Sequence, residues 1–166
     1  ATVPLGIEST FRYIDPNPPG YDVVMATLYQ TSHNLIWTLK FFNLLFISLG
    51  ILFFYLFFKK FLGSPSKAAF ATFILAMVPA FVSRFIWSHS LVITLLPLIL
   101  YGLISIEDDR RWAYFTGIVF GAALIIQFTQ PMKFAVMMFL FGAVRLCKDK
   151  TLWKPYMKVI IIAIIV

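Results

Sequence analysis

Long apolar stretches alternate with short polar ones along this chain. The apolar stretches lie at about 36–58, 68–82, 91–106, 113–128 and 134–144, and a further one begins near Tyr156. A helix needs about 20 mainly apolar residues to cross the hydrocarbon core of a bilayer. The pattern therefore predicts an all-α, polytopic transmembrane helix bundle, with about five full spans and a sixth that is incomplete.

An extended polar segment, residues 1–33, precedes the predicted bundle over 34–166. Its motif "YIDPNPPGYD" (13–22) contains three prolines and a glycine. Proline removes a backbone donor and pushes the preceding residue toward an extended conformation, so a turn or extended loop is expected. The pattern from 21 to 32 is that of a short amphipathic helix, which we expect to lie on the bilayer surface.

The composition agrees with a membrane protein. The chain is 61% hydrophobic, whereas soluble domains are about 45–50% apolar. The net charge of +7 comes from 14 basic and 7 acidic residues. These basic residues gather at the ends of the apolar stretches, a distribution typical of membrane topology, so no nucleic-acid partner is expected. The single cysteine, Cys147, allows no internal disulfide. The chain begins with Ala1 and stops at Val166 inside "VIIIAIIV", which indicates a fragment that is incomplete at both ends.

The loop charges predict an orientation. Alternate loops carry nine basic residues, namely Lys59, Lys60, Lys67, Arg110, Arg111, Arg145, Lys148, Lys150 and Lys154. The other turns carry two, Arg84 and Lys133. Because cytoplasmic loops are enriched in Lys and Arg, the first set is predicted to face the cytoplasm. The N-terminal loop, the turn "SRFIWSHS" (83–90) and the turn "QFTQPMK" (127–133) then face outward, and the plasma membrane is the expected location.

Several polar side chains would share this outer face. They are Asp15, Asp22, Arg84, Trp87, His89, Gln130 and Lys133. Carboxylates with an imidazole can bind a divalent cation, and arginine and lysine can bind a phosphate. The set therefore suggests a site for an anionic, lipid-linked substrate, with Arg84, Trp87, Gln130 and Lys133 as candidate substrate-binding residues.

Each candidate also has a structural interpretation. Asp15 can start a turn before Pro16, and Asp22 can be a first-turn acid at a helix N-terminus. Arg84 can reach lipid head groups, and Trp87 can belong to the aromatic belt. His89 can cap the helix that follows.

Two further polar features are interpreted as structural alone. Gln127 is expected to lie inside the fourth apolar helix (113–128) and to bond to a neighbouring helix. The acids of "EDDRRW" (107–112) are expected to be neutralised by the adjacent Arg110 and Arg111 rather than to bind a metal.

Three segments carry a resemblance to a known group of enzymes. "DPNPPGYDVVMATLY" (15–29), followed by an apolar helix, resembles the end of the first external loop of GT-C glycosyltransferases. "VPAFVSRFIWSHSLVITLLPLILY" (78–101) is similar to the stretch between spans three and four of the oligosaccharyltransferase catalytic subunit and its archaeal relatives. "RRWAYFTGIVFGAALIIQFTQP" (110–131) continues the likeness. "PPGYD" and "SRFIWSHS" are its most specific parts.

The resemblance implies a multispanning enzyme that acts outside the cytoplasm. It would transfer a sugar or oligosaccharide from a polyprenyl-phosphate-linked donor to a protein or glycan acceptor, with Mn²⁺ or Mg²⁺. Asp15 and Asp22 fall in the loop that carries the acidic motif of such enzymes, and are candidate catalytic residues. No acid follows Arg84 where the oligosaccharyltransferases have acids. His89 is therefore the candidate metal ligand of that turn, together with Asp15.

Two other function classes fit the same spans. A transporter or lipid-handling protein is expected to show charges at the membrane midplane or paired broken helices, and the chain shows neither pattern in its sequence. A non-catalytic membrane scaffold related to GT-C enzymes would explain the missing acids after Arg84. Transfer of label from a polyprenyl-phosphate sugar would distinguish the enzyme from the scaffold.

Overall fold

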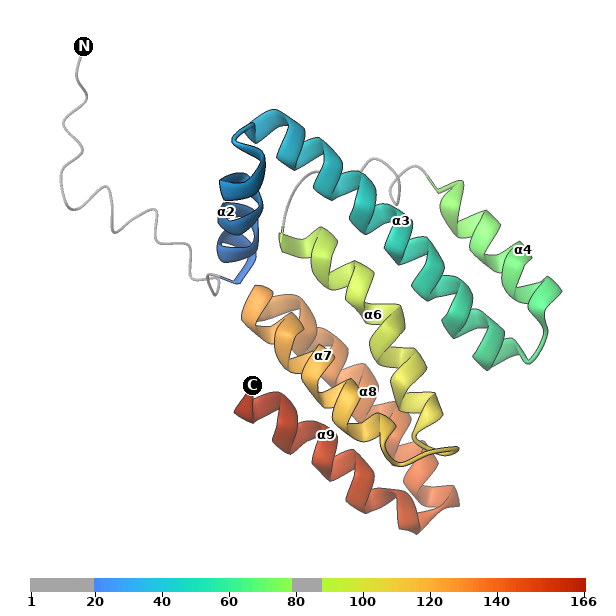
Figure 1. The fold of residues 1–166 in the computed structure, drawn as a ribbon. Coiled ribbons are helices and arrows are strands. Elements are labelled where there is room, and N and C mark those ends of the chain that lie inside the picture. The colour runs from blue at the N-terminus through green and yellow to red at the C-terminus, as the bar shows by residue number, and fades with distance from the viewer. Residues whose placement is uncertain (1–19, 79–87) are drawn as a thin grey trace.

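A computed structural model describes residues 20–78 and 88–166, in which α-helices are joined by short turns (Figure 1). The helices are α2 (Gly20–Ser32), α3 (Leu35–Leu62), α4 (Pro65–Ala76), α6 (Ser88–Ser105), α7 (Trp112–Ile126), α8 (Thr129–Lys148) and α9 (Trp153–Ile165). A 3₁₀ turn, η1 (Lys150–Leu152), precedes α9. The described residues contain no strand, which confirms the all-α class.

Every predicted apolar stretch contains a helix, but several helix ends were predicted wrongly. α4 ends at Ala76, not near 82. α8 covers Thr129–Lys148 rather than 134–144, because its polar ends are helical as well. Hydropathy marks how much of a helix is apolar, whereas the backbone continues through charged residues such as Lys133 and Arg145.

Local signals explain the turns around α3 and α4. The Asn34 side chain accepts a hydrogen bond from the Trp37 N–H at 3.0 Å and so caps the start of α3. Gly63 ends α3 with a φ of 64°, in the left-handed region that glycine enters without steric cost. Pro65 then occupies the first turn of α4, where its missing N–H leaves no helix bond unmade.

Two helices have the length and composition of membrane spans among the described residues. They are Leu35–Leu62 (α3) and Thr129–Lys148 (α8). α6 and α7 are apolar but shorter. Most of the α3 and α8 surface is exposed in the protein alone, with 12% and 11% of their apolar windows buried. Such exposure of apolar side chains suits contact with lipid or with further protein.

The helices form a row in the order α4, α3, α6, α7 and α9, with α8 packed beside α6 and α7 (Figure 1). α2 lies across one end of the row, against α3 and α7. The main core joins α6, α7 and α9 through Ile99, Leu103, Ile106, Ala113, Phe120, Ala123, Leu152, Tyr156, Val159 and Ala163. In this arrangement the polar turns that alternate along the chain lie at opposite ends of the bundle.

Two glycines one turn apart bring α7 close to α9. A Cβ at Gly117 would lie 2.8 Å from the Ile162 Cβ, and a Cβ at Gly121 would lie 2.8 Å from the Val166 Cβ. Both distances are shorter than a real carbon contact. Small residues four apart allow this close approach between membrane helices, so this spacing sets the α7–α9 interface.

Replacing Gly117 by alanine is expected to destabilise the protein by about 1–3 kcal/mol, because the new methyl group forces α9 to move. Gly142 in α8 provides the matched control, since a Cβ there meets nothing within 4 Å. Gly142→Ala is expected to stabilise the protein by about 0.4–1 kcal/mol through the lower entropy of the unfolded chain. Thermal unfolding of both variants in detergent measures the difference. Equal shifts of the same sign would show that α7 and α9 do not meet at Gly117.

Candidate functional site

One end of the bundle brings together most of the segments that carry predicted site residues. We call it the α2 end, and it consists of α2, the first turns of α6 and α8, and the last turn of α7. A small hydrophobic cluster unites these elements. Its buried members are Leu91 and Val92 of α6 and Ile126 of α7, and Tyr21, Phe46, Leu95 and Phe134 pack around them.

A close backbone contact attaches α2 to α7. A Cβ at Gly20 would lie 2.7 Å from the carbonyl oxygen of Ile125, so no larger residue fits at position 20 without displacing α2. Packing against α7 therefore explains why the "PPG" motif has a glycine at position 20. This contact fixes the start of α2, and with it Asp22, next to the end of α7.

Asp22 and Lys133 are both exposed, and each is adjacent in the sequence to a residue that packs in this hydrophobic cluster. Asp22 follows Tyr21 and lies in the first turn of α2. Lys133 precedes Phe134, in the second turn of α8. An acid in a first turn is stabilised by the helix dipole, so the structural interpretation of Asp22 is confirmed, and the side chain stays available to a ligand.

Gln130 is half-buried in the first turn of α8. The N–H groups at the start of a helix have no partner within the helix and attract anions. In α8 these are the N–H groups of Thr129 and Gln130, because Pro131 has no N–H and the Met132 N–H donates to the Phe128 carbonyl oxygen. Lys133 adds a positive charge one turn later. The start of α8 is thus a positively polarised surface at the α2 end.

Tyr21 was not predicted as a site residue, although it stands beside Asp22 in the motif "PPGYD". Its hydroxyl is buried and has no hydrogen-bond partner among the described residues. Burial, and then the charge of Asp22, raise the pKa of Tyr21 above its usual value. The hydroxyl therefore stays protonated at neutral pH and can donate a hydrogen bond at the α2 end. The available signal was an aromatic residue directly before an acid in the motif "PPGYD".

Other predicted residues cannot be placed in this way. Asp15, Arg84 and Trp87 lie outside the described residues. His89 belongs to the first turn of α6, but the structure does not describe its side chain. No group of three histidine, cysteine or acidic side chains that could hold a metal occurs in the part of the chain that the structure describes.

Gln127 corrects one expectation. It does not lie inside a helix, because α7 ends at Ile126 and Gln127 adopts an extended conformation as its C-cap. It is 2% exposed and belongs to the tight junction between α7 and α8. The expectation of a helix through Gln127 was wrong, because the end of α7 depends on the backbone and not on hydropathy.

The opposite end of the bundle, which we call the basic end, contains residues 59–67, 107–111 and 145–154, which are helix ends and the turns between them. Glu107 forms an ion pair with Arg145, at 3.2 Å between Oε1 and Nε, and Asp108 pairs with Lys60. The acids of "EDDRRW" were expected to be neutralised by their neighbouring arginines. Two of them are instead neutralised by residues in the last turns of α3 and α8, because folding brings these helix ends and the α6–α7 turn to one end of the bundle.

The comparison with known families is decisive. The dolichyl-phosphate-mannose-protein mannosyltransferase family matches residues 16–166 of the chain. The chain belongs to this family. The chain is therefore a membrane glycosyltransferase of the GT-C type that acts with a polyprenyl-phosphate sugar donor, and its GT-C resemblance is confirmed. No curated protein and no solved structure matches the chain. The matched range includes every predicted site residue except Asp15.

Proposed function

We propose that this protein transfers mannose from a polyprenyl-phosphate carrier to a protein acceptor at the α2 end of the bundle. The observation that carries the proposal is the convergence of the starts of α2, α6 and α8 on one hydrophobic cluster, with Asp22 exposed next to the cluster residue Tyr21. The family membership supports the sugar, the donor and the acceptor class. A closer relation to the oligosaccharyltransferases within the GT-C enzymes is a separate prediction, which the donor experiment below tests.

The proposed residues divide into two roles. The acceptor nucleophile attacks the anomeric carbon of mannose, the bond from that carbon to the phosphate oxygen breaks, and polyprenyl phosphate leaves with its negative charge. Asp22, or Asp15, takes the proton that the acceptor loses. Arg84 and Lys133 bind the phosphate, while Gln130 and Trp87 contact the sugar or the carrier. Charge-assisted bonds to a leaving phosphate stabilise the transition state more than the ground state when charge develops there.

We further propose that Asp15 and His89 can hold Mn²⁺ or Mg²⁺. A carboxylate and an imidazole suit Mn²⁺ better than Mg²⁺, which prefers oxygen ligands and keeps several waters. The described residues add no third ligand, and no step above depends on the metal. Transfer that survives chelation unchanged would contradict this part of the proposal alone.

Donor choice tests the function directly. The whole protein in liposomes is expected to transfer label from polyprenyl-phosphate mannose to acceptor proteins. A preference for a polyprenyl-pyrophosphate oligosaccharide would instead support the oligosaccharyltransferase likeness. Failure with every carrier-linked sugar would favour the non-catalytic scaffold, and ion-coupled uptake into the same liposomes would favour a transporter.

The orientation forms part of the proposal. We infer that α3, α4, α6, α7, α8 and α9 cross the plasma membrane, with the α2 end outside and the basic end in the cytoplasm. The excess of lysine and arginine at the basic end supports this assignment.

Cysteine labelling in intact cells provides the topology prediction. Cys147 is exposed at the basic end, so a membrane-impermeant maleimide is expected to label it only after the membrane is opened. Asp22→Cys, in a Cys147→Ser background, is expected to react in intact cells because Asp22 is exposed at the α2 end. The reverse pattern would invert the orientation.

A further inference from the structure

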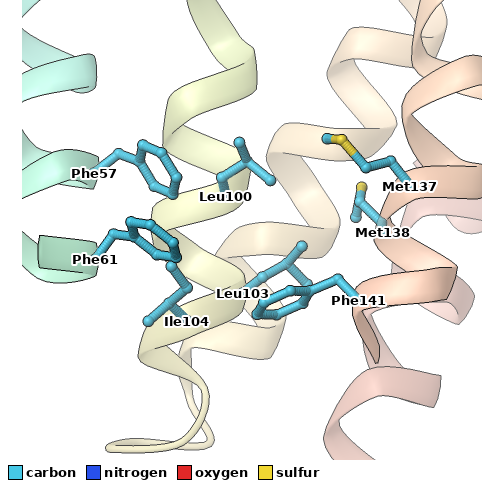
Figure 2. Close-up of a pocket in the computed structure, with 8 residues that line it drawn as sticks. All are labelled: Phe57, Phe61, Leu100, Leu103, Ile104, Met137, Met138 and Phe141. Atoms are coloured by element: carbon cyan, nitrogen blue, oxygen red, sulfur yellow. The ribbon is translucent and has the colours of Figure 1, made fainter. Parts of the chain in front are cut away.

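An apolar groove lies between α3, α6 and α8, near the basic end of the bundle. Its volume is about 200 Å³, and Figure 2 shows its lining: Phe57 and Phe61 from α3, Leu100, Leu103 and Ile104 from α6, and Met137, Met138 and Phe141 from α8. The side chains of α3 and α8 face each other across α6. The proposed transfer site at the α2 end does not use this groove.

The lining is hydrocarbon, aromatic ring and thioether, with no charged or hydrogen-bonding side chain. Water is a poor occupant of such a space, because a buried water needs polar partners. Apolar cavities of about 150 Å³ bind benzene-sized molecules and stay dry. A groove of this size therefore accepts a segment of hydrocarbon chain, and the flexible Met137 and Met138 can adapt to its shape.

Basic side chains continue the same helix faces beyond the groove. On α8, Arg145 and Lys148 follow Phe141 at intervals of four and seven residues, which places all three on one face. The Arg145 Cζ lies 5.3 Å from the centre of the Phe141 ring. On α3, Lys60 follows Phe57 by three residues and so shares its face.

The acids of the α6–α7 turn neutralise only part of this charge. Arg145 pairs with Glu107, and Lys60 pairs with Asp108. Lys59 and Lys148 are exposed at the same end and take part in no ion pair among the described residues. Lys59 lies two residues from both Phe57 and Phe61, so it projects from the opposite face of α3. The groove therefore ends beside one unneutralised lysine, Lys148, at the depth where lipid head groups lie if the bundle spans the membrane.

We propose that this groove binds an anionic phospholipid of the leaflet at the basic end. One acyl chain lies between Phe57 and Phe61 of α3 and Met137 of α8, and the phosphate contacts Lys148. Juxtamembrane basic residues attract anionic lipids in this way. The lipid would connect α8 to α3. These two helices have few direct contacts and face each other mainly across the groove.

Lipid retention tests the proposal without any transfer assay. The whole protein, purified in detergent with equal amounts of phosphatidylglycerol and phosphatidylcholine, is expected to retain phosphatidylglycerol preferentially. Met137→Trp, which fills the groove, is expected to abolish the preference. Met132→Trp is the matched control, because Met132 is also on α8 and is similarly exposed, at 46% against 44% for Met137, but does not line the groove.

A second pair of variants leaves the groove intact. Lys148→Gln is expected to reduce phosphatidylglycerol retention about five-fold, with phosphatidylcholine unchanged. Lys59→Gln is the matched control and is expected to leave retention unchanged, because Lys59 is also exposed at the basic end but projects from the opposite face of α3. Equal retention of the two lipids by the unmodified protein, or the same preference in Met137→Trp and Met132→Trp, would overturn the proposal. Another helix in the groove would also overturn it. In that case Met137→Cys, in a Cys147→Ser background, would resist a lipid-soluble maleimide that labels Met132→Cys.

Discussion

Asp22→Asn is expected to lower kcat for mannose transfer by about 100-fold or more, with little change in KM for the donor. The physical reason is that an amide cannot take the proton that the acceptor loses, and a positioned base contributes about 10²–10⁴-fold. Asparagine keeps the size of the side chain and a first-turn position that it tolerates well. The measurement is steady-state transfer from polyprenyl-phosphate mannose by the reconstituted whole protein.

Asp149→Asn is the matched control for this variant. Asp149 is an exposed aspartate at the basic end, and its side chain accepts a hydrogen bond from the Thr151 N–H at 2.8 Å. That bond lowers the pKa of Asp149, and asparagine can accept it about as well. Transfer by Asp149→Asn is therefore expected to equal that of the unmodified protein. Full activity in Asp22→Asn, with an inactive Asp15→Asn, would assign the base to Asp15.

Arg84→Ala is expected to raise KM for the polyprenyl-phosphate donor by ten-fold or more. A hydrogen bond to a charged group contributes about 1.5–3 kcal/mol, and each 1.4 kcal/mol corresponds to a factor of ten. Arg84→Lys keeps the charge but loses the two-pronged geometry of the guanidinium, so an intermediate KM is expected. Donor titrations at saturating acceptor measure both variants.

Arg110→Ala provides the comparison for Arg84. Arg110 is exposed in the α6–α7 turn at the basic end, away from the proposed donor site. Its KM for the donor is expected to be unchanged. If both arginine variants lower the amount of folded protein and neither changes KM, Arg84 serves the structure or the lipid head groups and not the donor phosphate.

Much of the candidate site could be predicted from the sequence, because loop charge and hydropathy are local properties. The alternation of basic and weakly charged loops already separated Asp22, Gln130 and Lys133 from the basic residues, and the fold places them at the opposite end from those residues. Tyr21 escaped prediction. Tyr21 is a candidate site residue because its hydroxyl is buried near Leu91 and Ile126, which belong to helices far along the chain.

The "EDDRRW" turn illustrates why residues adjacent in the sequence are a poor guide to ion-pair partners. Adjacent arginines seemed the natural partners for its acids, yet the charges that meet Glu107 and Asp108 come from Arg145 and Lys60. Neighbours in a turn often point away from each other, whereas loops at the same end of a bundle bring their side chains into contact. A short search along the sequence therefore misses such pairs.

By itself the sequence determined that the protein is helical and membrane-embedded, where each apolar stretch lies, and which turns share an end of the bundle. These properties depend on hydropathy summed over a helix length and on charge counted loop by loop. The tertiary structure alone decided that α7 packs on α9 through Gly117, that Gly20 attaches α2 to Ile125, and that a dry groove opens between α3 and α8. Each of these depends on how side chains from distant segments interlock, and apolar stretches of similar composition do not encode which partner they meet.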